Sequence, residues 1–479
     1  MSVHVPRLVV AGLSGDSGKT IVSLALTASL RERGLKVSTF KKGPDYIDAA
    51  WLTEVSGRNC RNLDSYLMSA DDIMHSFLQE GENADIAIIE GNRGIFDGRN
   101  SEGTHSTAEL AKLLQTPVLL VINAAKVTRT LAAIVKGCLD FDPEVKVAGI
   151  ILNGIAGKRH ETTIRESLAA YTSVPVLGTL PAWDKGDSLI PGRHLGLVTP
   201  SEFIEQENLS QRLVQLGENN LEIEQIVELA NSANDLPHRS VIRPVPKPQS
   251  VKVGVFRDSA FTFYYPENLE ALEDAGAELV TISSLEDDHL PDIDALYIGG
   301  GFPETHAERM SSNRALLDAV KEAVENNLPV YAECGGLVFL SKSIEWEGKV
   351  YPMAGVFPLE LTMQTKPVGH GYTEIEIAED NPFFEKGIKI KGHEFHYSGP
   401  KEEILQSQCC MRVVTGVGLG NKLDGQLYRN CLATYMHIHA LGTSAWAPGL
   451  IAAAQRSRDQ KKSEDSLSEG QASKLKVMT

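Results

Sequence analysis

The chain of 479 residues carries a formal net charge of −17, with 42% hydrophobic and 23% charged residues. This excess of acidic groups argues against a nucleic-acid partner and against adhesion to an anionic membrane surface, and no apolar run approaches the roughly twenty residues that span a bilayer. Because residues 1–7 lack the basic and apolar regions of a secretory signal peptide, we expect a cytoplasmic protein.

A glycine-rich loop follows the first apolar run of the chain. The segment Gly-Leu-Ser-Gly-Asp-Ser-Gly-Lys-Thr occupies residues 12–20, between an apolar run at 8–11 and a helical pattern at 21–31. In a strand, loop and helix of this kind, backbone N–H groups and the helix N-terminus hold phosphate groups. The spacing is unusual, because Leu13 stands where the motif expects a glycine. We predict ATP binding by Gly12, Gly15, Gly18, Lys19 and Thr20.

The first half of the chain alternates apolar runs with helical patterns. This alternation predicts an α/β fold with a doubly wound parallel sheet. Its strands are expected at 8–11, 36–40, 86–90, 118–123, 147–153 and 176–180. A second series, at 251–256, 278–282, 295–299 and 329–332, predicts another α/β unit.

A proline-rich segment separates the two series. Prolines recur through residues 236–250 and favour an extended connector over an element of a core. Residues 455–479 are mostly polar and charged, which predicts a disordered tail. We therefore expect an ATP- and substrate-binding domain at 1–235, a linker at 236–250, a second domain at 251–454 and a tail at 455–479.

A cysteine in the second half stands where a strand is expected to give way to a helix. The segment Pro-Val-Tyr-Ala-Glu-Cys-Gly-Gly-Leu at 329–337 places Cys334 on that turn, where Gly335 and Gly336 let the backbone take a strained conformation. We expect the sulfur to be exposed near a helix N-terminus, which favours the thiolate. Cys334 is therefore the predicted nucleophile.

Two other features of the second half suit a cysteine nucleophile. His437 and His439 occupy alternate positions of a strand-like run, and we prefer His437 as the base. A glycine-rich turn, Tyr-Ile-Gly-Gly-Gly-Phe-Pro-Glu at 297–304, follows another expected strand. The predicted oxyanion hole is formed by the N–H groups of Gly300 and Gly335.

These motifs resemble those of two known families. The turn at 329–340, the glycine-rich turn at 297–304 and the Tyr-x-His segment at 435–437 look like the class I glutamine amidotransferase domain, in the variant of cobyrinate and cobyrate synthases. The first half is similar to ATPases of the dethiobiotin synthetase type, whose loop has the same early glycine and the same Gly-Lys-Thr end. The resemblance implies a nucleotide-binding domain followed by a glutaminase domain.

Further segments at 40–48, 89–98 and 190–198 complete a resemblance to the cobyrinic acid a,c-diamide synthase family, from residue 6 to about residue 450. The resemblance implies ATP- and Mg²⁺-dependent amidation of the a and c acetate groups of cobyrinate, a step of cobalamin biosynthesis. L-glutamine would supply the ammonia, with a Cys–His pair as the glutaminase. Glu304 and Glu333 lie nearby in the sequence and are interpreted as turn and cap residues.

The first domain must activate a carboxylate in this scheme. Oxide leaves poorly, so an acyl phosphate is the expected intermediate, and Lys19 and Lys41 would neutralise the transferring phosphate. The predicted ligands of Mg²⁺ are Thr20, Asp48 and Glu90. The predicted catalytic residues of this domain are Lys41, Asp45 and Asp48. For Asp45, orienting ammonia and binding metal both stay open.

A polycarboxylate substrate requires cations in an acidic protein. The candidates are Lys42, Arg58, Arg61, Arg93, Arg193 and His194. The same motifs fit amidation of nickel-sirohydrochlorin or hydrogenobyrinate. A dimerising ATPase switch of the partitioning type is another alternative, but Ser14 stands where such switches carry a lysine, and a switch has no use for Cys334. A homodimeric assembly stays open.

Overall fold

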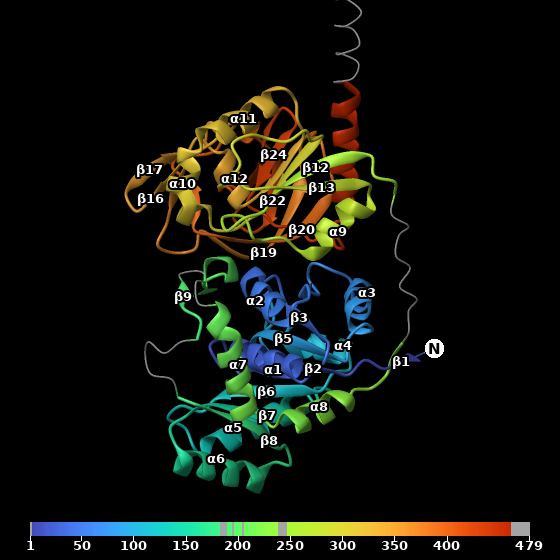
Figure 1. Cartoon of the computed structure of the whole chain (residues 1–479), viewed down its shortest axis with the longest axis vertical. Coiled ribbons are helices and arrows are strands. Elements are labelled where there is room, and N and C mark those ends of the chain that lie inside the picture. The colour runs from blue at the N-terminus through green and yellow to red at the C-terminus, as the bar shows by residue number, and fades with distance from the viewer. Residues whose placement is uncertain (1, 183–188, 194–195, 204–205, 238–246, 461–479) are drawn as a thin grey trace, which may run out of the picture. The chain divides into compact units, whose positions relative to one another are not determined.

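The computed structural model describes residues 2–182, 189–193, 196–203, 206–237 and 247–460 (Figure 1). The chain divides into two compact units, Met1–Ile242 and Arg243–Thr479, called unit 1 and unit 2 below. The division falls inside the proline-rich segment 236–250. None of the described helices combines the length and apolar character that crossing a bilayer requires.

Unit 1 is built around a parallel sheet. Among its described residues the strand order is β4-β3-β5-β2-β6-β7-β8. The strands are β2 Arg7–Gly12, β3 Val37–Lys42, β4 Arg61–Leu63, β5 Ile86–Gly94, β6 Val118–Asn123, β7 Val147–Ile155 and β8 Val176–Pro181. Six of these were expected from apolar runs, which the helices on the sheet faces bury. The strand β4 has no such run, so the sequence pattern does not predict it.

Helices link the strands of unit 1. They are α1 Lys19–Glu32, α2 Tyr46–Ser56, α3 Ala70–Gly81, α4 Thr107–Leu113, α5 Thr130–Phe141, α6 Lys158–Tyr171, α7 Gln206–Asn220 and α8 Ile223–Asn231. The helix α7 packs closely on α1, since a Cβ at Gly217 would lie 2.1 Å from Ser29 Oγ. Short elements complete the unit: β1 Ser2–Val3 paired with β11 Leu236–Pro237, β9 Gly192–Arg193 paired with β10 Gly196–Leu197, and η1 Pro200–Glu202.

Unit 2 holds a mixed sheet. Its described strand order is β13-β12-β14-β15-β24-β23-β22-β19-β20, parallel from β13 to β24 and antiparallel beyond. The strands are β12 Val251–Phe256, β13 Ala277–Ile282, β14 Ala295–Ile298, β15 Val330–Glu333, β19 Gly369–Ile377, β20 Lys389–His396, β22 Cys409–Thr415, β23 Leu423–Tyr428 and β24 Cys431–Thr434. The parallel half confirms the predicted α/β series.

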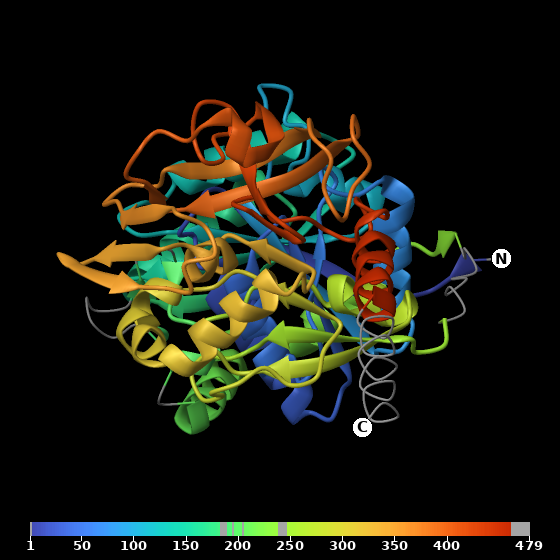
Figure 2. The same cartoon turned by 90° about the horizontal axis from the view of Figure 1, so that it is seen from above.

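The remaining elements of unit 2 are helices and a smaller sheet. The helices are α9 Pro266–Asp274, α10 Ala307–Ser312, α11 Arg314–Glu325, α12 Gly335–Leu340, η2 Pro303–His306, η3 Gln406–Gln408 and a helix over 446–460. The smaller sheet has the order β17-β16-β18-β21, with β16 Ser343–Trp346, β17 Lys349–Pro352, β18 Glu360–Met363 and β21 Ser398–Pro400. Its β16–β17 hairpin projects from the edge of the unit (Figures 1 and 2).

The central strands of unit 2 are buried on both faces. Along β14, Leu296 and Ile298 belong to one apolar cluster, whereas Tyr297 belongs to a second cluster on the opposite face. This alternation follows from the two-residue period of a strand. The second cluster includes Trp446 of the C-terminal helix. The sheet therefore carries a core on each side, and the turn at Cys334 follows β15, one of its central strands.

Two predicted boundaries of the second half are wrong in detail. The tail was expected from residue 455, but the helix over 446–460 continues through the first part of it, because Ser457 is buried and Gln455 Nε2 donates to Ser250 Oγ at 3.1 Å. The segment that carries His437 was expected to be strand-like, but the strand β24 ends at Thr434, before it reaches the histidine. Of the predicted linker, Leu236–Pro237 forms β11, and 238–246 lies outside the described residues.

Candidate active sites

The glycine-rich loop joins β2 to α1 in unit 1. Gly18 precedes α1 with a φ of 96°, a left-handed conformation that favours glycine. Gly12 is constrained by space, since a Cβ there would lie 2.1 Å from Ser17 Oγ, whereas a Cβ at Gly15 would meet no atom within 4 Å. Lys19 Nζ donates to Ser14 O at 2.9 Å, so the lysine folds back over the loop. The predicted strand, loop and helix are thus present.

Asn153, on the neighbouring strand β7, supports this loop. Its Nδ2 donates to Ser17 O at 3.0 Å, and a Cβ at Gly18 would lie 2.3 Å from the same nitrogen. Asn153 belongs to none of the predicted motifs. Its position at the end of the expected strand 147–153 could have indicated its role, because the carboxyl ends of parallel strands form the ligand-binding edge of a sheet.

A buried lysine joins two carboxylates beside the loop. Lys41 is 1% exposed, and its Nζ lies 2.6 Å from Asp48 Oδ2 and 2.8 Å from Glu90 Oε1. Thr20 Oγ1 donates to Glu90 Oε1 at 2.7 Å and lies 3.4 Å from Asp48 Oδ2. Lys41 and Glu90 lie on the adjacent strands β3 and β5, whereas Thr20 and Asp48 lie in the first turns of α1 and α2, which follow β2 and β3. The predicted metal ligands and Lys41 are therefore neighbours.

Burial and opposite charges act against each other in this cluster. Burial alone would lower the pKa of Lys41, but Asp48 and Glu90 outweigh it and raise the pKa well above its ordinary value. Burial would likewise raise the pKa of Asp48, yet Lys41 holds it below its usual range. For Glu90 burial prevails over Lys41 and raises the pKa to about 7. Burial, followed by repulsion from Lys41, lowers the pKa of Lys19.

Asp45 has a local structural task. Its side chain accepts hydrogen bonds from Ile47 N and Asp48 N, both at 3.0 Å, and so caps α2. Its Oδ2 lies 3.9 Å from Lys41 Nζ. Burial, with a smaller contribution from Asp48, raises the pKa of Asp45 to about 6. Asp45 thus borders the cluster while fixing the helix that presents Asp48.

The cluster suits a hard cation such as Mg²⁺. Glu90 Oε2 is buried and has no hydrogen-bond partner among the described residues, which leaves this oxygen able to accept a metal ion. Hydroxyl and carboxylate oxygens are the ligands that Mg²⁺ prefers. Among the described residues, however, no group of three or more His, Cys, Asp or Glu side chains could hold a metal by itself. Phosphate oxygens of a nucleotide would have to complete the coordination.

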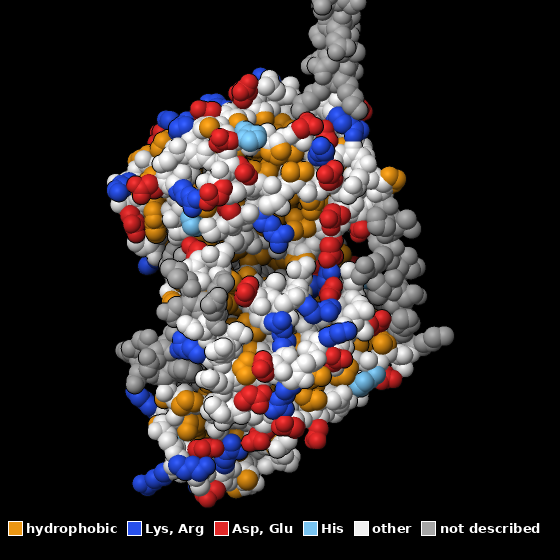
Figure 3. Space-filling model, in the orientation of Figure 1, with side chains coloured by type: hydrophobic (Ala, Val, Ile, Leu, Met, Phe, Trp, Pro, Cys, Tyr) orange, Lys and Arg blue, Asp and Glu red, His pale blue; other side chains and the backbone are white. Residues whose placement is uncertain are grey.

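The predicted substrate cations do not form one group. Lys42 is buried at the end of β3, and Arg93 is exposed with a φ of 50°. Arg58 and Arg61 instead pair with Glu80 of α3, at 3.1 and 3.0 Å. The side chain of Arg193 is not described, and His194 lies outside the described residues. On the face shown in Figure 3, basic side chains are interspersed with acidic ones.

Cys334 sits on a sharp turn between β15 and α12 in unit 2. It has a φ of 48° and a ψ of −94°, so the strained residue is the cysteine itself. The two glycines that follow were expected to carry the strain. They instead provide space, since a Cβ at Gly336 would lie 2.6 Å from Ile298 O and one at Gly335 would lie 3.2 Å from Gly301 N. The turn thus presses tightly against the glycine-rich segment after β14.

The environment of the thiol differs from the expectation of an exposed, thiolate-favouring site. Cys334 is 8% exposed. Burial raises the pKa of the Cys334 thiol well above its ordinary value, and Glu304 and Glu333 add to the shift, opposed by the N–H of Gly335. Burial therefore favours the neutral thiol over the thiolate. A base must remove its proton before it can attack.

His437 lies beyond the end of β24, on an irregular segment that pairs with β20. Its backbone exchanges hydrogen bonds with His393, at 2.8 and 3.1 Å, and the two rings stack with centroids 5.0 Å apart. His437 Nδ1 lies 3.3 Å from Glu333 Oε2. The earlier interpretation of Glu333 as a cap residue is therefore wrong, because it is the last residue of β15 and its carboxylate faces a histidine 104 residues away in the sequence.

His439 has different surroundings. Its Nε2 lies 3.6 Å from Glu267 Oε2, and its ring packs on Tyr265 with centroids 4.6 Å apart. The glycine turn, by contrast, contacts His437: a Cβ at Gly300 would lie 2.5 Å from His437 Cε1. Gly300, Gly335 and His437 are therefore brought together, as expected for an oxyanion turn beside a base. This geometry supports the preference for His437.

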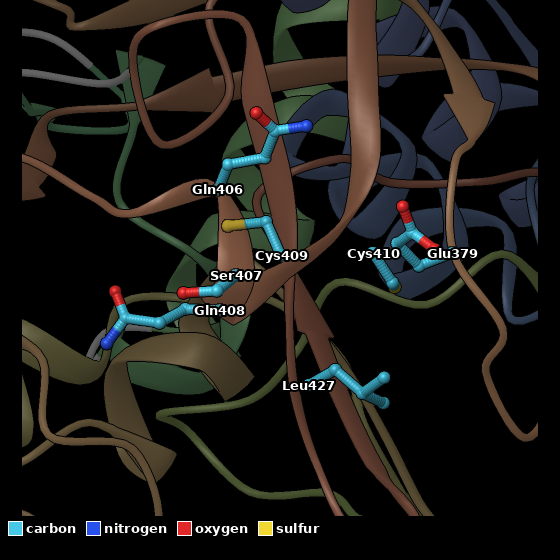
Figure 4. A pocket seen from close by; sticks show the side chains of 7 residues that line it. All are labelled: Glu379, Gln406, Ser407, Gln408, Cys409, Cys410 and Leu427. Atoms are coloured by element: carbon cyan, nitrogen blue, oxygen red, sulfur yellow. The ribbon is translucent and has the colours of Figure 1, made fainter.

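A pocket elsewhere in unit 2 is lined by Glu379, Gln406, Ser407, Gln408, Cys409, Cys410 and Leu427 (Figure 4). Its described lining includes none of the residues predicted for either site. Burial raises the pKa of both of its cysteines to about 12, so neither thiol is activated.

Comparisons with known proteins identify the families of the two units. Residues 8–197 match the model of the CobQ/CobB/MinD/ParA nucleotide binding domain, and residues 252–445 match that of the CobB/CobQ-like glutamine amidotransferase domain. Among solved structures, PurLQS from Thermotoga maritima covers 44% of this chain and 97% of its own at 18% identity, with a TM-score of 0.32. The two family matches show that the chain combines a P-loop nucleotide-binding unit with a glutamine amidotransferase unit, which confirms the predicted fold class.

Curated relatives match almost the whole chain. The cobyrinate a,c-diamide synthase of Magnetococcus marinus is 41% identical over 94% of this chain and 97% of its own. Those of Dehalococcoides mccartyi and Archaeoglobus fulgidus are 40% and 37% identical, over 91% and 96% of this chain and 96% and 99% of their own. The chain belongs to the cobyrinate a,c-diamide synthase family, which confirms the resemblance found in its motifs.

Proposed function

We propose that this chain catalyses the ATP-dependent amidation of the a and c acetate carboxylates of cobyrinate, with ammonia released from L-glutamine. The observation that carries the proposal is the presence in one chain of a lysine–carboxylate cluster beside a phosphate loop and of a cysteine elbow beside a histidine. Its full-length relatives named cobyrinate a,c-diamide synthase support the substrate. The reaction is proposed to take place in the cytoplasm.

The residues of unit 1 serve the activation of the carboxylate. ATP, when bound, would supply the phosphoryl group that converts the carboxylate oxygen into a leaving group, and Mg²⁺ would offset the charge of the phosphates. Lys19 and Lys41 place positive charge beside the loop, where the transferring phosphoryl group would develop negative charge. Thr20, Asp48 and Glu90 would hold the metal. While the metal is absent, the ion pairs with Lys41 keep the carboxylates of Asp48 and Glu90 close together.

The residues of unit 2 release ammonia from glutamine. Cys334 Sγ attacks the amide carbon while His437 takes the thiol proton, and the N–H groups of Gly300 and Gly335 receive the oxyanion. His437 then returns the proton to the departing nitrogen, which leaves as ammonia and a glutamyl thioester remains. Water hydrolyses the thioester to glutamate and regenerates the thiol. Ammonia displaces phosphate from the acyl phosphate to give the amide.

Cations near the phosphate loop would receive the carboxylates of the macrocycle. Lys42 and Arg93 are the best placed of the predicted set, because they end β3 and lie near the end of β5, beside the lysine–carboxylate cluster. Arg58 and Arg61 are already neutralised by Glu80. These cations would bind the carboxylates of the macrocycle and do not distinguish the metal at its centre, so nickel-sirohydrochlorin and hydrogenobyrinate are the alternatives to test.

The test is a substrate panel. Purified protein is incubated with ATP, MgCl₂ and glutamine, and with cobyrinate, hydrogenobyrinate or nickel-sirohydrochlorin in turn. Mass spectrometry then counts the amides formed on each. The proposal expects two amides on cobyrinate and slower reaction with the other two. Faster diamidation of nickel-sirohydrochlorin would show that it, and not cobyrinate, is the substrate, and the proposed reaction type would stand. If no amide forms on any of the three, the proposal is overturned.

A further inference from the structure

Glu333 occupies an unusual place, directly before the nucleophile and inside the core. It is fully buried at the end of β15. Its Oε2 lies 3.3 Å from His437 Nδ1 and 3.4 Å from the hydroxyl of Tyr297, and its Oε1 accepts the N–H of Ile438 at 3.2 Å. A buried carboxylate requires such donors, and the imidazole is the one among them that can also become positively charged.

The two edges of the His437 ring face different groups. Nδ1 faces Glu333, whereas a Cβ at Gly300 would lie 3.2 Å from Nε2. Gly300 belongs to the glycine turn that also borders Gly335, the residue after the nucleophile. A carboxylate can only accept a hydrogen bond, so its contact with Nδ1 places the proton on that nitrogen. Nε2, on the side of the oxyanion turn, then carries no proton.

We propose that Glu333 is a positioning residue of the glutaminase: it holds His437 in the Nδ1–H tautomer and stabilises the imidazolium that forms when Nε2 takes the proton of Cys334. This inference rests on the proposed glutaminase function of Cys334. It adds a third member to a site that the family resemblance describes as a Cys–His pair. The acid comes from the residue next to the nucleophile, so one strand end presents both groups.

The charges support the same arrangement. While His437 is neutral, the negative charge of Glu333 disfavours a second negative charge on the neighbouring sulfur. Once the proton has moved from Cys334 to His437, the imidazolium lies between two anions and is favoured by both. Thiolate and imidazolium therefore form together. Glu333 would disfavour a thiolate while His437 is neutral and stabilise the imidazolium at the moment of attack.

A purely structural role for Glu333 must be distinguished from this one, because its carboxylate also anchors the segment at Ile438. The chain offers a matched control. Glu267 is a buried glutamate that lies 3.6 Å from the other histidine of the segment, His439. Its replacement by glutamine removes a comparable buried charge beside a comparable ring, without touching His437.

The experiment compares Glu333→Gln, Glu333→Asp and Glu267→Gln with the wild type. Glutaminase activity is measured across pH, and amidation with ammonium chloride reports the integrity of unit 1. For Glu333→Gln we expect the glutaminase kcat to fall on the order of 10²–10⁴-fold with little change in KM. Glu333→Asp should recover part of the rate, and Glu267→Gln should keep the wild-type kcat.

A wild-type kcat in Glu333→Gln would overturn the inference, as would equal losses of kcat in Glu333→Gln and Glu267→Gln. If Glu333→Gln does not fold, ¹⁵N NMR of the histidine-labelled wild type decides, with His437 assigned through His437→Gln. A proton on Nδ1 with an unprotonated Nε2 supports the inference, and a neutral ring protonated on Nε2 contradicts it. Absence of glutaminase activity in the wild type would instead contradict the proposed function, and the tautomer would still test the inference.

Discussion

Lys41 Nζ and Asp48 Oδ2 lie 2.6 Å apart in a buried ion pair, seven residues apart in the sequence. The strand β3 ends just after the lysine, and the helix α2 starts just before the aspartate. Glu90 completes the cluster from the adjacent strand β5. The ammonium group of Lys41 thus lies between two carboxylates, at the place where a metal–nucleotide complex is proposed to bind.

Removal of the buried lysine should destabilise unit 1. Lys41→Met leaves Asp48 and Glu90 as neighbouring buried acids without their counter-ion, which we expect to cost about 3–5 kcal/mol of unfolding free energy. Chemical denaturation measures the loss. MgCl₂ should restore part of it, because the carboxylates and Thr20 then accept the metal. Lys112→Met is the control, because its ion pairs are partly exposed and their loss should cost about 1 kcal/mol or less. Equal stability of Lys41→Met and the wild type would contradict the prediction.

The phosphate loop and the glutaminase should be separable by mutation. Lys19→Ala removes the cation at the start of α1 and should abolish amidation with either nitrogen source, while glutamine hydrolysis persists at a reduced level. Product analysis and a glutamate assay measure the two activities. Lys158→Ala, on the exposed start of α6, should keep both. Amidation at the wild-type rate in Lys19→Ala would show that the loop does not serve the reaction.

The nucleophile is tested by the choice of nitrogen source. Cys334→Ser should abolish amidation with glutamine and retain it with ammonium chloride, because the acyl phosphate accepts ammonia from solution. Cys138→Ser, at a partly exposed position of α5, should retain both. Loss of both activities in a folded Cys334→Ser protein would count against the two-site mechanism.

The pH dependence of stability has a specific source in unit 2. Burial raises the pKa of Asp424 from 3.8 to about 6, against hydrogen bonds from Thr434 Oγ1 and two backbone N–H groups. The folded state therefore keeps a proton that the unfolded chain has already lost, so stability falls as pH rises from about 4 to 6. The contribution of this shift is about 3 kcal/mol.

Asp424→Asn should remove this slope. The measurement is the free energy of unfolding between pH 4 and pH 7, taken as the difference between variant and wild type. Asp292→Asn is the control, because Asp292 is 98% exposed and should leave the slope unchanged. Parallel curves for Asp424→Asn and the wild type would contradict the assigned pKa.

The sequence predicted the parts of the structure that depend on local patterns. Apolar runs located the parallel strands, and the Gly-Lys-Thr and Cys-Gly-Gly segments located the two turns. The antiparallel strands β19 to β23 were not predicted, because their outer positions are only half-buried and no continuous apolar run marks them. The buried state of Cys334 also escaped prediction, since it depends on Gly301 and on other distant residues that pack around the elbow.

The local sequence pattern could not predict contacts between residues that are far apart in the chain. Glu333 and His437 are 104 residues apart and meet only because β15 and β24 are neighbours in the sheet. Arg58 and Arg61 looked available for a substrate, but α3 places Glu80 against both. Lys41, Asp48 and Glu90 could be grouped in advance, because Lys41 lies near the carboxyl end of β3, Asp48 lies in the first turn of the following helix, and Glu90 lies on the adjacent parallel strand.

The central claim is that glutamine nitrogen reaches both activated carboxylates of cobyrinate. The most direct measurement incubates the wild-type protein with cobyrinate, ATP, MgCl₂ and glutamine labelled with ¹⁵N at the amide, then determines the mass of the product. We predict a diamide that carries two ¹⁵N atoms, with ADP and phosphate formed for each amide. A cobyrinate mass that stays unchanged while ATP and glutamine are hydrolysed would contradict the account.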